Sequence, residues 1–409
     1  MRISMVAAVV GAALSAGKVQ AQEAWNDQLS KAISEGKASL DLRYRFEWVD
    51  QDGFDDEAEA SLLRSRLTLE SAPLYGFTAL LEADDVTNIG PNDYNSTENG
   101  KTEYPVVADP EYTEINQAWL KYTADTVKVT GGRQRINHLN QRFLGGVAWR
   151  QNEQTFDSGR IEWTPVENLS VDFTYAYNIN RIFGPDDGAN PADLEGDNFF
   201  LLANYQIAEG HRLSGFGYFL DIDEDGGFAA GKTVNNSSDT YGLEYSGKFR
   251  NIALRASYAS QSEAGDSELD YEANYYLLEA SVTVAGIKIQ GAYEVLESDN
   301  GVGFATPLAT AHKFQGWADL FLSTPGDGIE DANLTLSGKI GPVNVAAIYH
   351  DFQAESSSDD FGTELDMIAT WPVNDNFTVQ AKYASFDTDV ADRFPDTDRA
   401  WLTLQLKLP

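Results

Sequence analysis

Residues 38–49 alternate between apolar and polar side chains. Leu40, Leu42, Tyr44 and Phe46 share one parity, and the residues between them are mostly charged. Successive side chains of a β-strand point to opposite faces, so this segment is predicted to be a strand with one apolar and one charged face. The pattern recurs about eighteen times along the chain, which indicates an all-β protein.

The recurring segments are predicted to be strands whose boundaries follow the start and end of the alternation. They span residues 38–49, 60–71, 76–86, 113–122, 125–134, 155–164, 168–179, 197–207, 211–221, 239–247, 250–260, 272–283, 286–296, 331–340, 343–352, 362–371, 376–386 and 398–408. A soluble sandwich would bury the apolar faces between two sheets, but here the polar faces are too highly charged and the segments too long for that architecture. Residues 38–409 are therefore predicted to form one transmembrane antiparallel up-and-down β-barrel, with lipid outside and water inside.

The connections between the predicted strands alternate between short turns and long loops. Residues 123–124 and 285–286 are short connections, whereas 135–154 and 297–330 are long ones. Outer-membrane barrels have short periplasmic turns and long extracellular loops. If the mature N-terminus starts in the periplasm, every long connection falls outside the cell, as this architecture requires.

Residues 312–322 could be taken for a nineteenth strand. An odd number would place the two chain ends on opposite sides of the membrane, and bacterial single-chain barrels use even numbers. We therefore assign this segment to the long outer connection, folded toward the lumen, and leave open whether it plugs the bore. A barrel of about eighteen strands is wide enough for water and solutes.

The N-terminal residues have the features of an export signal. Arg2 precedes the apolar residues 6–14, and a small residue, Ala21, closes a cleavage motif, so residues 1–21 are predicted to be a signal peptide. Residues 22–37 are predicted to be a periplasmic segment. The expected location is the bacterial outer membrane, where lipid, lipopolysaccharide and the assembly machinery are the expected partners of a monomeric barrel.

The composition narrows the function. The chain has 409 residues, no cysteine and a formal net charge of -35, which excludes an ordinary nucleic-acid-binding protein. Asp221, Asp223 and Asp225 imitate a calcium loop, but its twelfth position is Lys232 instead of glutamate. No nucleophile motif accompanies the four histidines. We expect no enzyme activity, no cofactor and no metal.

Arginines collect on the inward parity of the first strands and the last strand. They are Arg43, Arg45, Arg64, Arg66, Arg160 and Arg399. Arg133 shares the parity of Val127 and faces the lumen only if Gly131-Gly132 forms a bulge. Guanidinium groups bind carboxylates through paired hydrogen bonds, and a narrow cleft focuses their field. The set indicates either anion selectivity or ordinary ion pairs that brace the wall.

Four segments in order along the chain carry a family resemblance. They are INQAWLKY (115–122), GGRQRI (131–136), RFLGGVAWRQNEQTFD (142–157) and FATPLATAHKFQGWAD (304–319). Together they resemble the alginate export family of outer-membrane proteins. The resemblance implies an eighteen-stranded barrel whose arginine-rich constriction passes an acidic polysaccharide. It adds Arg133 and Arg150 to the pore-lining arginines, and implies that Asp157 orients one of them.

These observations predict a passive diffusion channel for anionic solutes, most simply poly- or oligosaccharides of the uronate type, selected by lumen arginines. A general or small-anion porin without a dedicated sugar substrate is the alternative interpretation. A plugged barrel with a structural role is a third. The sequence leaves the direction of transport and the identity of the solute open.

Overall fold

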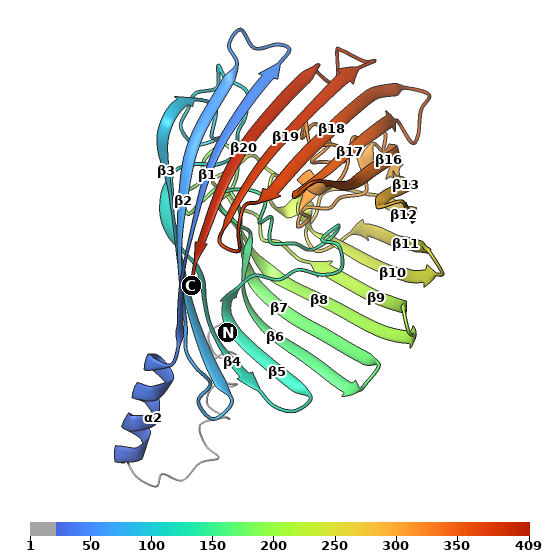
Figure 1. The fold of residues 1–409 in the computed structure, drawn as a ribbon. Helices are drawn as coiled ribbons and strands as arrows, with labels where there is room; N and C mark the ends of the chain where they lie inside the picture. The colour runs from blue at the N-terminus through green and yellow to red at the C-terminus, as the bar shows by residue number, and fades with distance from the viewer. Residues whose placement is uncertain (1–21) are drawn as a thin grey trace.

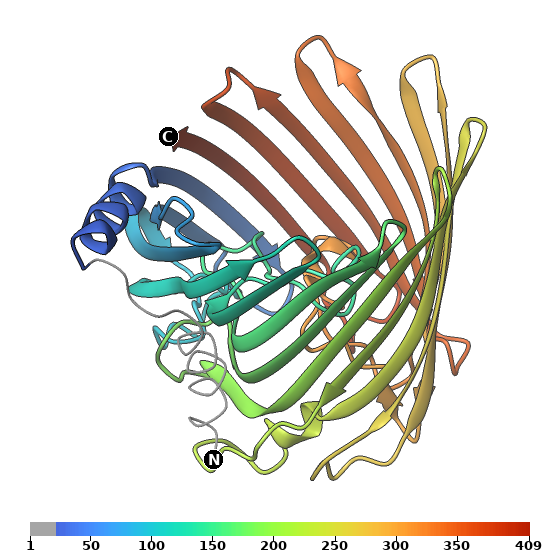
Figure 2. The same ribbon diagram turned by 90° about the horizontal axis from the view of Figure 1, so that it is seen from below.

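The structure is a computed structural model that describes residues 22–409, so the predicted signal peptide, residues 1–21, lies outside the described residues. Within the described range, eighteen long strands form one antiparallel sheet. β1 (Lys37–Gln51) pairs with β2 (Ala58–Glu70) on one side and with β20 (Thr397–Leu408) on the other. The sheet therefore closes into a barrel (Figures 1 and 2).

The remaining barrel strands follow in chain order. They are β3 (Phe77–Asp93), β4 (Tyr112–Thr123), β5 (Val127–Gln134), β6 (Thr155–Val166), β7 (Leu169–Asn180), β8 (Asp193–Ala208), β9 (His211–Leu220), β10 (Ser238–Phe249), β11 (Ile252–Glu263), β12 (Glu272–Val284), β13 (Ile287–Leu296), β16 (Ile329–Ile340), β17 (Val343–Gln353), β18 (Asp360–Pro372) and β19 (Phe377–Thr388). Short elements outside the barrel wall are α2 (Gln22–Ser34), β14 (Ser298–Asp299), β15 (Val302–Gly303) and the 3-10 turns η1 (Val234–Asn236) and η2 (Ala311–Lys313).

Every predicted strand is confirmed, and the clearest difference in boundaries is at β3. The alternation predicted an end at residue 86, but the strand continues to Asp93 and pairs with β2 beyond a register shift between Ala60 and Leu62. The added residues include Gly90 and Pro91 and are half-exposed or exposed on both faces. Because neither face meets lipid there, no apolar alternation marks this part of the strand.

The two parities of a strand meet different surroundings. On β2, Leu67 and Leu69 face outward and are 47% and 45% exposed, whereas Arg64 and Arg66 face inward and are 1% and 8% exposed. An apolar outer face and a charged inner face reverse the arrangement of a soluble protein. The apolar outer face favours contact with lipid, and the closed ring of strands satisfies the backbone hydrogen bonds that a bilayer cannot.

Short and long connections lie at opposite ends of the barrel, as predicted. The β12–β13 turn is Ala285-Gly286, with φ of 51° and 85°. Two successive positive φ values belong to the tight turn that matches strand twist, and glycine adopts them without steric cost. This end carries the C-terminus as well and corresponds to the periplasmic side.

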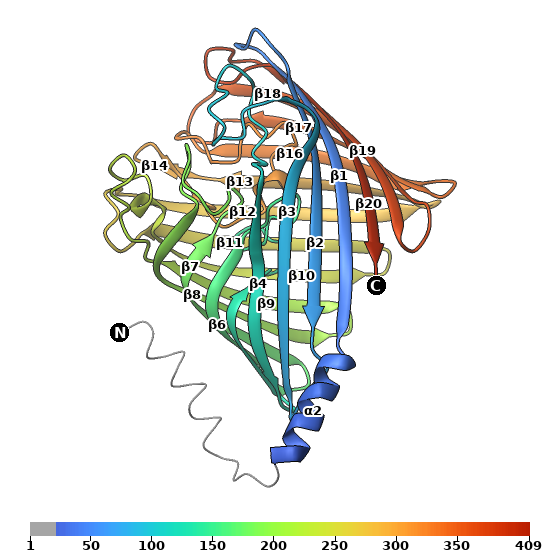
Figure 3. The same cartoon turned by 90° about the vertical axis from the view of Figure 1, so that its left-hand side faces the viewer.

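The predicted periplasmic segment, residues 22–37, contains an unpredicted helix, α2, which extends from the periplasmic end of the barrel (Figure 3). Its last turn is tied to the β2–β3 turn, because the Ala72 amide donates to the Ala32 carbonyl at 2.8 Å. Among residues 22–409, no helix combines the length and apolarity needed to cross a membrane.

Two long connections, residues 135–154 and 297–328, fold into the bore (Figure 2). They hydrogen-bond to each other: the Gly145 amide donates to the Leu308 carbonyl at 2.9 Å, and the Thr310 amide to the Gln141 carbonyl at 3.0 Å. Residues 312–322 lie in the second connection and form no barrel strand, as predicted. Below, these connections are called the first and second inward loops.

Candidate functional site

The candidate site is a group of arginines on neighbouring strands, here called the arginine wall. Its members are Arg43 and Arg45 on β1, Arg64 and Arg66 on β2, and Arg399 on β20. Arg43 stands directly opposite Arg64, and Val49 of β1 stands opposite Arg399. Like charges opposite each other destabilise a sheet, so the wall requires counter-charges from elsewhere.

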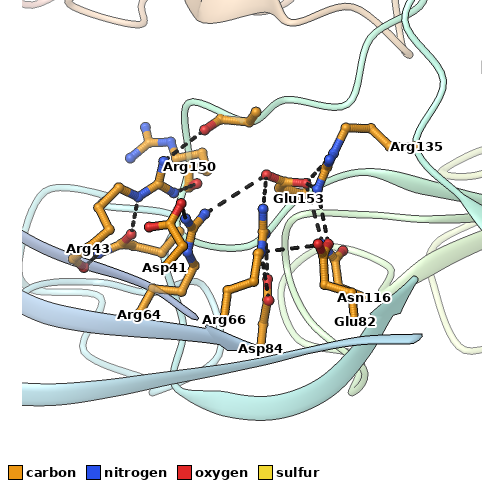
Figure 4. Close-up of polar contacts among 12 residues, drawn as sticks. Asp41, Arg43, Arg64, Arg66, Glu82, Asp84, Asn116, Arg135, Arg150 and Glu153 are labelled. Carbon is orange, nitrogen blue, oxygen red and sulfur yellow. Dashed lines mark hydrogen bonds and ion pairs between the residues drawn. The ribbon is translucent and has the colours of Figure 1, made fainter. Parts of the chain in front are cut away.

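The first inward loop covers Arg43. The guanidinium donates from Nε to Gln151 Oε1 at 2.8 Å, from Nη1 to the Ala148 carbonyl at 2.9 Å and from Nη2 to the Arg150 carbonyl (Figure 4). One barrel side chain thereby binds three residues of the loop. Arg43 is 7% exposed, so it supports the loop and is not a free cation in the bore.

Arg66 is held by two carboxylates from different parts of the chain. Its Nε and Nη2 donate to both oxygens of Asp84 on β3, at 2.7 and 2.5 Å, and its Nη1 donates to Glu153 Oε1 at 2.7 Å. Glu153, in the first inward loop, also pairs with Arg135 (Figure 4). Burial raises the pKa of Glu153, but the charges of Arg66 and Arg135 outweigh it and lower the pKa to about 2.

A second ionic cluster joins both inward loops to the wall. Arg150 of the first loop pairs with Glu47 on β1 at 3.3 Å and with Asp319 of the second loop at 2.8 Å. Arg399 approaches the same two carboxylates at 3.4 and 3.7 Å. Arg45 lies 3.9 Å from Asp109, a fully buried residue of the β3–β4 connection. Carboxylates from the two inward loops and from the β3–β4 connection therefore form ion pairs with the arginines of the wall.

Some guanidinium donors in the wall are left without hydrogen bonds. Arg64 approaches Asp41 at 3.4 Å and Glu153 at 3.9 Å. Its Nε and Nη1 have no hydrogen-bond partner among the described residues, and neither do Nη1 of Arg45 and Nε of Arg399. Buried donors are normally satisfied, so these atoms are hydrogen-bonding capacity that the wall does not use within the described residues.

An aromatic cage, which the sequence did not predict, lies where the inward loops meet the wall. Lys382 on β19 places Nζ 3.8 Å from the Trp149 ring centre, 3.6 Å from that of Trp317 and 5.0 Å from that of Trp401. His312 stacks on Trp149, with ring centres 4.1 Å apart and planes at 7°. A cation among three indole rings is held by strong, desolvated cation–π attraction.

His312 links the cage to the ionic cluster. Its Nδ1 lies 2.6 Å from Asp319 Oδ1, and its Nε2 lies 2.8 Å from Lys382 Nζ. Burial, opposed by Asp319, lowers the pKa of His312 to about 3, so the ring is neutral at physiological pH. A neutral ring with these neighbours donates a hydrogen bond from Nδ1 to the carboxylate and accepts one from the lysine ammonium at Nε2.

Replacing Trp149 with alanine is expected to lower the free energy of unfolding by about 3 kcal/mol, because the ring contacts His312, Lys382 and, at 4.1 Å, Arg45. Urea titration of the barrel in lipid vesicles measures the effect. Trp149→Phe keeps a ring for stacking and should retain about half or more of the lost stability. Equal losses in both variants would contradict a stacking role.

A family model described as Alginate export matches residues 35–306. The chain belongs to the alginate export family. No curated protein matches it. Membership of this family, with the closed eighteen-stranded barrel, identifies an outer-membrane channel and not an enzyme.

Solved outer-membrane porins share the fold of this alginate export family member. OccK3 (OpdO) of Pseudomonas aeruginosa is 13% identical, with a TM-score of 0.69 over 95% of this chain and 99% of that one. OccK9 (OpdG) of the same organism is 16% identical, with a TM-score of 0.67 over 92% and 100%. OpdK of that organism, solved with vanillate, is 11% identical, with a TM-score of 0.68 over 91% and 98%. At such identities the likeness concerns the fold alone.

The structure corrects the predicted lumen placement of Arg133 and Asp157. The two residues do pair, with Arg133 Nε donating to Asp157 Oδ1 at 2.8 Å. However, Asp157 has the parity of Ile161, which is 44% exposed on the outer face. Pairing of β5 with β4 and β6 continues in register through Gly131-Gly132, so no bulge turns Arg133 inward. Arg135, just beyond β5, turns inward instead.

Arg160 faces the lumen but lies apart from the arginine wall. It donates to Asp172 on β7, which also lies 3.6 Å from His138 Nε2. Strands β3, β4 and β5 separate β6, which carries Arg160, from β2. Arg43, Arg45, Arg64, Arg66, Arg150 and Arg399 are thus brought together, whereas Arg133 and Arg160 are not.

Proposed function

We propose that this channel passes anionic saccharides of the uronate type by passive diffusion, with the arginine wall as the selective constriction. The observation that carries the proposal is the chemistry of the wall. Its guanidinium groups bind carboxylates presented by the connections between strands, and buried donors of Arg64 stay unused among the described residues. A uronate residue offers the same carboxylate, and guanidinium binds it in the same paired geometry.

The loop carboxylates suggest how such a solute moves. Glu153, Asp109 and Asp319 reach the wall from three connections and neutralise it. A passing uronate exchanges with one of them at a time, so each step replaces one carboxylate–guanidinium contact with another. Exchange keeps binding weak enough for release, which conduction requires.

The apolar outer face of the barrel supports the proposed membrane partners, and a solved porin of the same fold supports a carboxylate solute. Apolar side chains cover the outer face on strands around the ring, which favours a monomer in lipid and lipopolysaccharide, inserted by the outer-membrane assembly machinery. OpdK, which has the same fold, was solved with vanillate, itself a carboxylate. A carboxylate-bearing solute is compatible with this architecture.

Replacing Arg64 with glutamine is expected to lower the ratio of chloride to potassium permeability by roughly threefold, because the variant removes a cation and leaves Asp41 and Glu153 in place. The reversal potential under a potassium chloride gradient measures this ratio. Arg64 makes only long ion-pair contacts, so the barrel should still fold. Block of the wild-type current by uronate oligomers should weaken in the same variant.

Arg133→Gln is the matched control, since it removes the same charge from the outer face and should leave the reversal potential unchanged. An unchanged potential in Arg64→Gln would remove the wall from ion selection. Anion preference without block by uronate oligomers would favour the small-anion porin. A wild-type barrel that carries no current would favour the plugged alternative.

A further inference from the structure

The lysines of the barrel wall are concentrated near its periplasmic end. Inward-facing examples close to short turns are Lys121, Lys128, Lys248, Lys288 and Lys339. The long connections at the other end are rich in aspartate and glutamate, as in residues 221–225. The bore therefore leads from an acidic extracellular mouth to a more basic periplasmic mouth. A field with this direction attracts anions at the periplasmic mouth.

Two of these lysines line one hollow of about 490 Å³ on the inner wall. Lys288 stands opposite Ser337, and Lys339 stands opposite Asn344, so β13, β16 and β17 present them on one face. Asn344 in turn stands opposite Thr370 on β18. Hydroxyl and amide groups thus lie beside the two ammonium groups, the mixture that a carboxylated sugar needs.

The charges of this hollow are not neutralised as those of the arginine wall are. Neither Lys288 nor Lys339 has a carboxylate within 4.0 Å among the described residues, and Lys288 Nζ donates to Gln290 at 2.6 Å. By contrast, Arg255 on β11 lies 3.7 Å from Glu279. Lysine is a flexible, strongly hydrated point charge, which suits loose capture better than rigid bidentate binding.

We propose that this hollow, here called the lysine vestibule, is a second binding subsite for anionic saccharides, separate from the arginine wall. The proposal rests on the proposed function and extends it. A carboxylate from the periplasm would contact Lys288 and Lys339, and neighbouring sugar hydroxyls would bond to Ser337, Asn344 and Thr370. The saccharide would then already lie in the bore before its leading sugar residue reaches the arginine wall.

The test is single-channel recording with uronate oligomers added to one side of an oriented barrel. In the Lys288→Gln/Lys339→Gln double variant, the association rate for block from the periplasmic side is expected to fall about tenfold. Block from the extracellular side should change less than about twofold, because that path meets the wall first. Both lysines are exposed, so the variant should fold. A double arginine variant at the same positions should restore periplasmic block.

Lys31→Gln is the matched control. It removes the same charge on the same side of the membrane, but from α2 outside the bore, where Lys31 is exposed. A tenfold loss confined to the double variant supports the subsite. An equal loss in the control, or undiminished periplasmic block in the double variant, overturns it while the wall stands. Wild-type channels blocked from neither side overturn the proposed function together with the subsite.

Discussion

Replacing residues 305–324 with a short glycine–serine linker is expected to raise single-channel conductance on the order of threefold, because an eighteen-stranded barrel without this segment is a wide tube. The segment is the central part of the second inward loop, which folds into the bore, and it contributes the buried Leu308, Ala318 and Phe321. Conductance in planar bilayers before and after the exchange measures its effect.

The barrel wall does not depend on this segment. Strands β13 and β16 pair directly, from Leu296 opposite Ile329 onward, so a linker closes the same hairpin. The loss falls on the interior, where Phe321 contacts Phe352, Phe361 and Phe386 with ring centres 4.7 to 5.9 Å apart. We therefore expect a folded barrel of lower stability whose ionic path is wider.

The control shortens a connection outside the two inward loops. Residues 224–231, between β9 and β10, are largely exposed, and a shorter linker there should leave conductance unchanged. Unchanged conductance after removal of residues 305–324 from a folded barrel would show that this segment does not limit the ion path. The plugging role of the second inward loop would then be wrong.

The sequence predicted the barrel because lipid and water impose opposite demands on the two faces of every strand. The alternation of Arg64 and Arg66 with Leu67 and Leu69 is a direct record of that difference. The alternation of apolar and polar side chains stops where the strand extends beyond the lipid. Residues 87–93 of β3 therefore carried no signal, although they continue to pair with β2.

The arginine wall could be predicted for the same reason, since parity and strand order suffice to place its members. Its counter-charges could not, because loops have no repeating geometry. Nothing local indicates that Glu153 reaches Arg66, or that Lys382 of β19 meets Trp149 and Trp317. Such contacts depend on how the inward loops pack together inside the closed barrel.

The error at Arg133 has a specific cause. Paired glycines often mark a bulge, and a bulge would have turned Arg133 into the lumen. Gly132 does have an unusual φ of 123°, but its role is close packing against β4. A side chain there would lie 2.3 Å from the Ala118 carbonyl oxygen. The glycine permits a close approach of two backbones without changing the register.

Replacing Glu153 with glutamine is expected to lower the free energy of unfolding at pH 7 by about 3 kcal/mol. The side chain is 3% exposed and binds Arg66 and Arg135, so the variant leaves two guanidinium charges without their shared carboxylate. The pKa of Glu153 supports this loss in the free energy of unfolding. It is about 2 in the folded protein, against about 4.3 for a free glutamate, a difference equivalent to about 3 kcal/mol.

The pH dependence distinguishes this charge from simple packing. A carboxyl group whose pKa is lowered on folding stabilises fully above its unfolded pKa, and this contribution is lost as the pH falls toward the folded pKa. The difference between wild type and Glu153→Gln should therefore be constant from pH 7 to about 5 and shrink toward zero near pH 2. Urea titrations in vesicles at pH 7, 4 and 2.5 measure it.

The exposed Glu209 provides the control, since Glu209→Gln should change stability by less than about 0.5 kcal/mol at each pH. A difference for Glu153→Gln that stays constant down to pH 2.5 would mean that the carboxylate charge is not what Glu153 contributes to stability.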